Sequence, residues 1–155
     1  MRVRKCGQKK NRKKKTTKKQ AWDSFSLYIR TLGNFTCVQC GATKEDGAIL
    51  QSGHVIPCGQ GHSIRFLEDD VFCQCQSCNF KHSQDNYDYF EWFKKIYGES
   101  KLHDIKSLKN TTGYLWVNMV SSFNKNDFNE NDYASIKEYY DHKLLEIKDN
   151  SSEIA

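Results

Sequence analysis

The chain has 155 residues, a hydrophobic fraction of 37%, an aromatic fraction of 13% and a net charge of +5. This length allows one domain with a tail and excludes two well-sized cores, and the low hydrophobic content predicts a small aromatic core that a bound metal would help to stabilise. No apolar run approaches the roughly 18 residues that a membrane span needs and no signal-peptide pattern is present, so we expect a cytoplasmic protein without membrane contact.

Residues 1–20 form a basic arm. They hold 11 Lys and Arg and no acidic residue, whereas the rest of the chain has 13 basic against 19 acidic residues. Such a segment cannot bury enough apolar surface to fold alone, so we expect it to be disordered when free and to bind nucleic acid through the phosphates. A solubilising tail is the alternative interpretation. The predicted nucleic-acid-binding residues are Arg2, Arg4, Lys5, Lys9, Lys10, Arg12, Lys13, Lys14, Lys15, Lys18 and Lys19, with Arg65 from the body of the chain.

A helix is predicted from Ala21 to Gly33, because its large apolar residues recur at helical spacing and suggest a face buried in the core. The pair Cys37 and Cys40, followed by Gly41, is then typical of a zinc knuckle. A redox dithiol is the other interpretation of one such pair, but a second pair occurs further along the chain.

The second pair is Cys75 and Cys78, and in a reducing compartment closely spaced cysteines are metal ligands more often than disulfides. Together the two pairs, Cys37 with Cys40 and Cys75 with Cys78, predict a closed tetrahedral site for structural zinc. Cys73 competes for a place in this set, because it alternates with Cys75 along a strand, but the spacing favours Cys75 and Cys78. We interpret Cys58 and Cys73 as spare thiols.

Between the two pairs, residues 48–55 are predicted to form a strand that places His54 near its end, beside a glycine-containing loop. A short alternating segment over residues 68–75 leads into a helix that begins at the second pair. Further helices are predicted over residues 83–98, 102–108, 114–123 and 133–147, with apolar stripes that belong first to the core.

This order of parts, a zinc knuckle, a strand ending in histidine, a loop, and a second knuckle that opens a helix with Cys78-Asn79, resembles the HNH nucleases with their ββα-metal unit. The longer pieces Ser52-Gly53-His54-Val55-Ile56-Pro57 and Gln74-Cys75-Gln-Ser-Cys78-Asn79 resemble the phage recombination protein family NinG, also called Rap. The resemblance covers residues 20–108. It implies a structure-specific endonuclease acting on branched recombination intermediates, in the cytoplasm of a host cell.

Carried over residue by residue, the resemblance implies that His54 is the general base and that Asn79 binds a catalytic Mg²⁺ or Mn²⁺ ion. The central asparagine of the HNH pattern corresponds to Asp70, which would orient the base. Many HNH enzymes carry a metal-binding Asp or His immediately before the base, whereas this chain has Gly53. We expect His82, Asp69 or Asp70 to substitute for it, with His82 as the candidate second ligand.

The sequence therefore predicts an α+β fold: a zinc-stapled, treble-clef-like HNH domain at residues 21–110, a disordered basic arm at 1–20 and a helical extension at 111–155. The predicted function is a metal-dependent DNA endonuclease that cuts branched DNA such as Holliday junctions and D-loops. A homodimer formed through the C-terminal helices is an open alternative to a monomer. The competing functions are a non-catalytic, zinc-scaffolded nucleic-acid-binding protein and a purely structural zinc protein.

Overall fold

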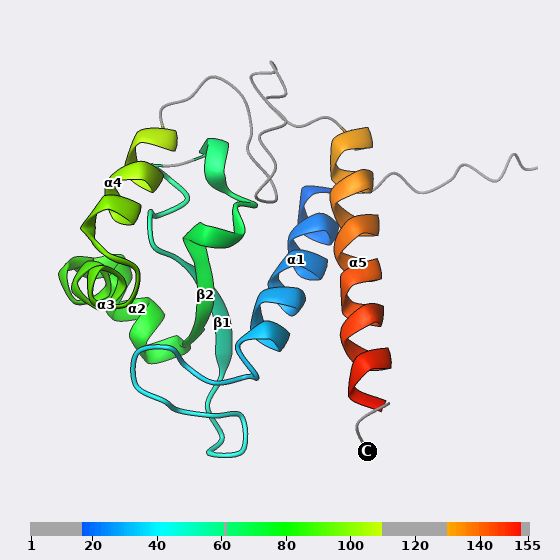
Figure 1. Cartoon of the computed structure of the whole chain (residues 1–155), viewed down its shortest axis with the longest axis horizontal. Helices are drawn as coiled ribbons and strands as arrows, with labels where there is room; N and C mark the ends of the chain where they lie inside the picture. Colours follow the sequence, from blue (N-terminus) through cyan, green and yellow to red (C-terminus); the bar gives the residue numbers. More distant parts are fainter. Residues whose placement is uncertain (1–16, 61, 110–129, 153–155) are drawn as a thin grey trace, which may run out of the picture.

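The computed structural model describes residues 17–60, 62–109 and 130–152, so residues 1–16 of the basic arm and the predicted helix at 114–123 lie outside the described residues. The fold is α+β, as predicted, with a two-stranded antiparallel sheet between two groups of helices (Figure 1). The elements are α1 (Lys18–Leu32), β1 (Leu50–His54), β2 (Val71–Cys75), α2 (Gln76–Gln84), α3 (Tyr87–Tyr97), α4 (Glu99–Leu108) and α5 (Glu130–Ser152), with single 3-10 turns at His62–Ile64 and Glu68–Asp70.

Helix α1 begins three residues earlier than the sequence predicts, so Lys18 and Lys19 belong to its first turn and not to a disordered arm. The cause is a capping box. Thr17 accepts a hydrogen bond from the backbone N–H of Gln20 at 3.3 Å, and the Gln20 side chain accepts one from the backbone N–H of Thr17 at 2.8 Å. Two backbone donors that a helix leaves unsatisfied at its start are thereby paired.

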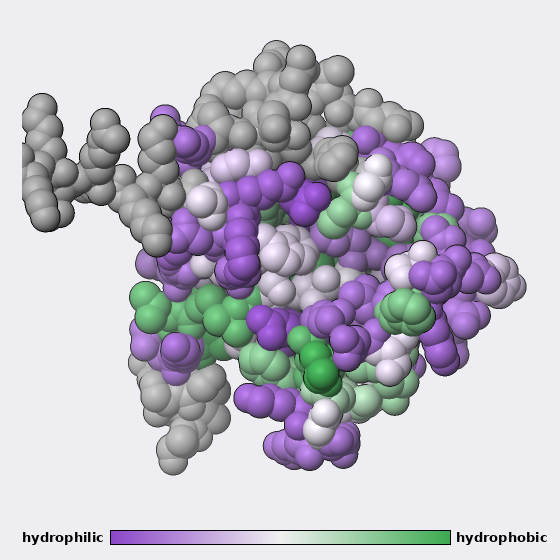
Figure 2. Space-filling model, turned by 180° about the vertical axis from the view of Figure 1, so that it is seen from behind, coloured by the Kyte–Doolittle hydropathy of each residue, from purple (hydrophilic) through white to green (hydrophobic). Residues whose placement is uncertain are grey.

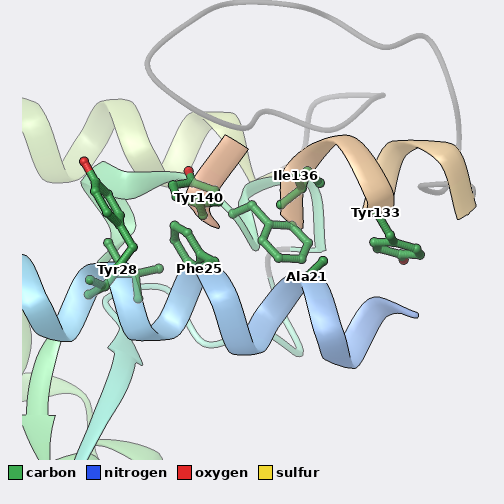
Figure 3. Packing of buried hydrophobic residues seen from close by; sticks show 9 residues of the cluster. Ala21, Phe25, Tyr28, Tyr133, Ile136 and Tyr140 are labelled. Carbon is green, nitrogen blue, oxygen red and sulfur yellow. The ribbon is translucent and has the colours of Figure 1, made fainter. Parts of the chain in front are cut away.

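Helix α5 packs lengthwise against α1 (Figure 1). The rings of Phe25 and Tyr140 are 4.9 Å apart between centroids and meet edge to face, and Ser24 donates a hydrogen bond to Asp141 at 2.7 Å. Figure 3 shows the side chains of this interface directed toward one another from the two helices: Ala21, Phe25 and Tyr28 from α1, and Tyr133, Ile136 and Tyr140 from α5. The C-terminal helix is therefore built into the same core as the first helix.

A second core lies on the other side of the hairpin, where α3 and α4 cover the loop that follows β1. Its central members, Ile56, Tyr89 and Phe93, are each at most 2% exposed. The predicted helix at residues 83–98 is interrupted here: α2 ends at Gln84 and α3 begins at Tyr87. The Asp85 side chain accepts a hydrogen bond from the backbone N–H of Tyr87 at 2.9 Å, a turn that stops one helix and starts the next.

The hairpin gives its two faces different neighbours. In its register Gly53 pairs with Phe72 and His54 with Val71. Successive side chains of a strand alternate between faces, so Ser52 and His54 are directed toward α1, where Ser26 donates a hydrogen bond to the Ser52 hydroxyl at 2.9 Å. Gln51 and Gly53 face α2. The candidate site residues thus lie on two sides of one short strand.

The face of the protein seen in Figure 2 is mostly hydrophilic. In the rear view of Figure 2, hydrophobic residues gather mainly at the side where α5 lies, and Leu145 of that helix is 57% exposed. Within the described ranges, we find no helix with the length and apolar character that crossing a bilayer requires.

Candidate metal centre and histidine site

Four cysteine thiols converge where the loop after α1 meets the junction of β2 and α2. The Sγ atoms of Cys37, Cys40, Cys75 and Cys78 all lie within 4.8 Å of one another. Cys75 is the last residue of β2 and the N-cap of α2, and Cys78 lies in the first turn of that helix. The two pairs that the spacing singled out are therefore brought together, and four cysteines that could hold a metal ion stand as one cluster.

The dimensions of the cluster fit zinc. The Sγ atoms of Cys40 and Cys75 are 3.7 Å apart. A tetrahedral ion with Zn–S bonds near 2.3 Å requires sulfur–sulfur separations of about 3.8 Å. The competing residue Cys73 is not part of the cluster. Its side chain lies beside Gly33 and is 1% exposed. Four thiolates leave no coordination position for a substrate, so the site is structural in type.

Backbone groups near the cysteines close the first turn and donate hydrogen bonds to sulfur, which favours the thiolate form that binds a metal ion. Gly41 has a φ of 76°, in the left-handed region that glycine tolerates, and its N–H donates to the Cys37 carbonyl at 2.9 Å, which closes the knuckle turn. The backbone N–H of Cys78 donates to Cys75 Sγ at 3.4 Å. Burial opposes ionisation of Cys37, but the backbone N–H groups of Cys40, Cys75 and Gln39 outweigh it and lower its pKa to about 7. One thiol is thus ready to ionise near neutral pH.

His54, the predicted general base, ends β1 and is enclosed. Its Nε2 lies 3.0 Å from the backbone carbonyl oxygen of Arg65, and the Sγ of Cys58 lies 3.0 Å from Nδ1 and 3.3 Å from Nε2. The indole ring of Trp22 stacks on the imidazole with 5.1 Å between centroids and 12° between planes. The side chain is only 7% exposed.

The enclosure of His54 changes its protonation. Burial, with smaller contributions from the charges of Arg65 and His82, lowers its pKa to about 4, although the hydrogen bond to the Arg65 carbonyl acts in the opposite direction. An imidazole that is buried without an acidic partner favours its neutral form. His54 is therefore neutral at physiological pH and presents one basic nitrogen.

The α2 face of the hairpin carries Asn79 and a set of carboxamides. Asn79 donates from Nδ2 to Gln51 Oε1 at 2.7 Å, and Gln74 donates from Nε2 to Gln39 Oε1 at 2.6 Å. The position of Gly53 lies between them, because a Cβ there would be 1.6 Å from Gln74 Oε1 and 3.0 Å from Asn79 Oδ1. Carboxamide oxygens thus occupy the space in which the sequence pattern expected a carboxylate.

His82 lies one helical turn beyond Asn79 on α2 and is also buried, at 7% exposed. Its ring meets Tyr89 edge to face at 4.5 Å, and neither ring nitrogen has a hydrogen-bond partner among the described residues. Burial lowers its pKa, opposed by the nearby carbonyls of His54 and Val55. It lines a cavity of about 100 Å³ whose other walls come from Gln39, Cys78, Lys81, Asp85, Asp88 and Tyr89.

The remaining predicted residues have other partners. Asp70 is fully buried, and its Oδ1 accepts a hydrogen bond from the backbone N–H of Ile56 at 2.8 Å, so its carboxyl group holds the chain just after His54. Asp69 forms an ion pair with Lys101. Arg65 contributes its carbonyl oxygen to His54, and its Nε has no hydrogen-bond partner in the described part of the chain.

Three neighbours of the site were missed in the sequence. Helical periodicity predicts only a core position for Trp22, the cysteine spacing makes Cys58 a spare thiol, and no pattern singles out Gln74. The one available signal was for Cys58, which follows His54 by four residues across the bend at Val55 and Ile56. The contact of Trp22 depends on how α1 packs against the hairpin, and those of Gln74 depend on the pairing of β1 with β2 and on the position of Gln39, which no spacing in the sequence encodes.

Comparison with models of protein families gives a match over residues 1–148 to the family described as Bacteriophage Lambda NinG protein. No curated protein and no solved structure matches the chain.

Proposed function

Because the chain belongs to the family of the bacteriophage lambda NinG protein, we propose that it is a metal-dependent DNA endonuclease that cuts branched recombination intermediates. The family match spans the basic arm, the cysteine cluster and the histidine strand. The resemblance of the segment from Cys37 to Asn79 to the HNH pattern supports hydrolysis of phosphodiesters, and the branch preference rests on the family resemblance alone.

The observation that carries the proposal is the state of His54. Its Nε2 donates to the Arg65 carbonyl, so the neutral ring keeps Nδ1 as an acceptor that can take a proton from an attacking water. A pKa of about 4 keeps this nitrogen unprotonated at neutral pH. Asp70 contributes indirectly: it accepts a hydrogen bond from the backbone N–H of Ile56 and so fixes the backbone two residues after His54.

A catalytic cation would be held on the α2 face, by Asn79 Oδ1 and a ring nitrogen of His82. One carboxamide oxygen and one imidazole without a carboxylate suit Mn²⁺ better than Mg²⁺. When bound, the ion would stabilise the negative charge that develops on the phosphate. His54 lies on the α1 side of β1, whereas Asn79 and His82 lie on the α2 side. A substrate in contact with both would therefore have to bind at the end of the strand.

DNA binding is assigned to the basic arm together with Arg65. The arm brings 11 positive charges to a body whose other residues are net acidic, so binding should fall steeply with salt as counterions are released. Zinc in the four-cysteine site would hold β2, α2 and the first knuckle in fixed positions.

A second candidate is a non-catalytic, zinc-scaffolded DNA-binding protein. The observation in its favour is that His54 is 7% exposed while Gly53 supplies no ligand and its space is filled by Gln74. A metal site without a carboxylate binds hard cations weakly. In this candidate function the arm binds DNA and the cysteine cluster holds zinc, but no hydrolysis takes place.

The two candidates are separated by a cleavage assay on four-way-junction and linear DNA with Mg²⁺ or Mn²⁺. We expect Mn²⁺-dependent cleavage of the junction, lost at least about 100-fold in His54→Ala, since a general base contributes roughly 10²–10⁴-fold. The matched control is His103→Ala, whose side chain is 83% exposed on α4. Cleavage that persists undiminished in His54→Ala contradicts the mechanism, and tight binding without cleavage under either metal favours the second candidate.

A further inference from the structure

The cavity of about 100 Å³ beside His82 lies between the first zinc knuckle, helix α2 and the start of helix α3. It has room for an ion with part of its water shell. His82 forms part of its wall and is 7% exposed, yet neither ring nitrogen has a hydrogen-bond partner among the described residues. Buried polar groups are normally paired, so an unpaired imidazole on the wall of a cavity indicates a ligand that the cavity holds.

Two carboxylate groups line the same cavity. Asp85 lies in the turn between α2 and α3, and Asp88 lies in the first turn of α3. Asp85 uses its Oδ1 to accept a hydrogen bond from the backbone N–H of Tyr87, which leaves Oδ2 out of that bond. Within the ranges that the structure describes, neither Asp85 nor Asp88 forms an ion pair. Both negative charges are therefore available to a cation in the cavity.

The charges around the cavity favour a cation over an anion. Lys81 brings a positive charge to the wall, against the negative charges of Asp85 and Asp88. Cys78 also lines the cavity and belongs to the four-cysteine cluster, in which four thiolates around one Zn²⁺ ion would leave a net negative charge. Imidazole nitrogen and carboxylate oxygen are both ligands of divalent metals such as Mn²⁺. A phosphate group in the same place would be repelled by this net negative charge.

We propose that this cavity binds one divalent cation, with a ring nitrogen of His82 as the direct ligand and the carboxylates of Asp85 and Asp88 acting through water molecules that the ion keeps. The carboxylates act through water because, among the described residues, only the four cysteines bring three or more ligand atoms close together. The turn between α2 and α3 thus supplies the carboxylates that Gly53 does not. His82 is also assigned to the catalytic ion, so a role of this ion in hydrolysis rests on the proposed function, whereas its binding does not.

The test is a titration of Mn²⁺ into the zinc-loaded full chain, with the free ion followed by electron paramagnetic resonance. We expect one Mn²⁺ to bind per chain, and its affinity to fall at least about 10-fold in the double variant Asp85→Asn with Asp88→Asn, because residues that act through the outer shell of a metal contribute roughly 10–100-fold. Asp85→Asn keeps an oxygen for the Tyr87 N–H, so the turn is retained. Asp104→Asn, on an exposed side chain of α4, is the control and should bind Mn²⁺ like the wild type.

Paramagnetic broadening of NMR signals locates the bound ion. We expect Mn²⁺ to broaden the backbone amide signals of Gln39 and Tyr89, which line the cavity, at ratios that leave the signal of Leu145 on α5 unchanged. The same selective broadening should be absent from His82→Ala, in which the direct ligand is removed. The amide spectrum of each variant shows at the same time whether it has kept the wild-type fold.

Equal Mn²⁺ affinity in the wild type and the double variant would overturn the proposal, as would equal broadening of the Tyr89 and Leu145 signals, because water alone would then fill the cavity. Mn²⁺ that binds the wild type and is lost from the double variant, without cleavage of junction DNA by either protein, would reject the endonuclease function and leave the cation site standing. Cleavage that depends on His54 but not on Asp85 and Asp88, at unchanged Mn²⁺ affinity, would reject this cation site and leave the endonuclease function standing.

Discussion

The carboxamide of Gln74 lies where the side chain of Gly53 would begin: a Cβ on Gly53 would come within 1.6 Å of Gln74 Oε1 and 2.7 Å of its Cδ. Gln74 is fully buried, and its Nε2 donates to Gln39 in the first zinc knuckle. Because residue 53 has no side chain, the Gln74 carboxamide has room to lie across this face of the hairpin and to donate to Gln39, between Cys37 and Cys40.

Gly53→Ala should displace the Gln74 carboxamide and lower the free energy of unfolding by about 1–3 kcal/mol, the usual cost of overpacking a core. In a Gln74→Ala background the same substitution should cost much less, because the space is then empty. Urea unfolding of the four proteins measures this coupling. Equal costs of Gly53→Ala in both backgrounds would show that the contact is not the cause.

Removal of one thiol from the cluster should release zinc. Cys40→Ala is the informative variant, because Cys40 is exposed and its loss changes packing little, whereas Cys73→Ala removes a buried thiol outside the cluster. We expect metal analysis to give about one zinc per chain in the wild type and in Cys73→Ala and almost none in Cys40→Ala. Loss of a structural zinc should lower the free energy of unfolding by more than about 3 kcal/mol. Full zinc retention in Cys40→Ala would contradict the four-thiolate site.

Asp70 should make the protein less stable as pH rises. Burial, opposed by the hydrogen bond from Ile56 N–H, raises the pKa of its carboxyl group well above 3.8, so the folded state binds a proton that the unfolded state has lost. This contribution is complete below pH 3.8 and is lost as the pH rises through the folded-state pKa. Asp70→Asn keeps an oxygen for Ile56 N–H and cannot titrate.

The comparison of wild type with Asp70→Asn by urea unfolding at pH 5 and pH 8 isolates this group, since Glu68, His54 and His82 titrate alike in both proteins. From pH 5 to pH 8, we expect the free energy of unfolding of Asp70→Asn to rise relative to that of the wild type by at least about 1 kcal/mol. Asp104→Asn, on an exposed side chain of α4, is the control and should show no such gain. A parallel pH dependence in wild type and Asp70→Asn would contradict a buried neutral carboxyl group.

Helix α5 should contribute to the stability of the whole fold. Ile136 is 1% exposed in its contact with α1, whereas Leu145 of the same helix is 57% exposed. Ile136→Ala should cost about 2–5 kcal/mol through the cavity it leaves, and Leu145→Ala less than about 0.5 kcal/mol. Thermal unfolding followed by circular dichroism measures both. A similar small loss for the two variants would mean that α5 is not part of the core.

Deletion of residues 1–16 should weaken DNA binding by at least about 100-fold at low salt and flatten the dependence of affinity on salt, because nine basic residues are removed while the Thr17 capping box remains. Binding titrations at several salt concentrations measure both quantities. An unchanged salt slope would assign the arm to solubility alone. Deletion of residues 1–20 is less informative, since it also removes the first turn of α1.

The two cysteine pairs show how far spacing carries a prediction. Two side chains separated by two residues can reach one ion from a single turn, and two such pairs supply the four ligands that zinc prefers, so the cluster followed from the sequence. The same holds for the α1 stripe, where helical periodicity indicated the buried face that carries Phe25, Tyr28 and Ile29. In α3 the periodicity was a poorer guide, because Tyr87 and Ile96 are exposed and the buried residues are Tyr89 and Phe93. The start of α1 differed because Thr17 and Gln20 form a capping box inside what composition marked as a charged tail.

The surroundings of His54 did not follow from spacing. Its position at the end of a strand was predicted, but a strand alternates its side chains, and only the packing of α1 and α2 decides what each face meets. The packing of α1 placed Trp22 on the imidazole, the loop after β1 returned Cys58 to it, and the pairing of β1 with β2 put Gln74 over Gly53. The sequence by itself determined which four cysteines come together and the class of the fold, because local geometry suffices for both. The tertiary structure alone decided the burial and protonation of His54, because these depend on residues brought together from separate elements.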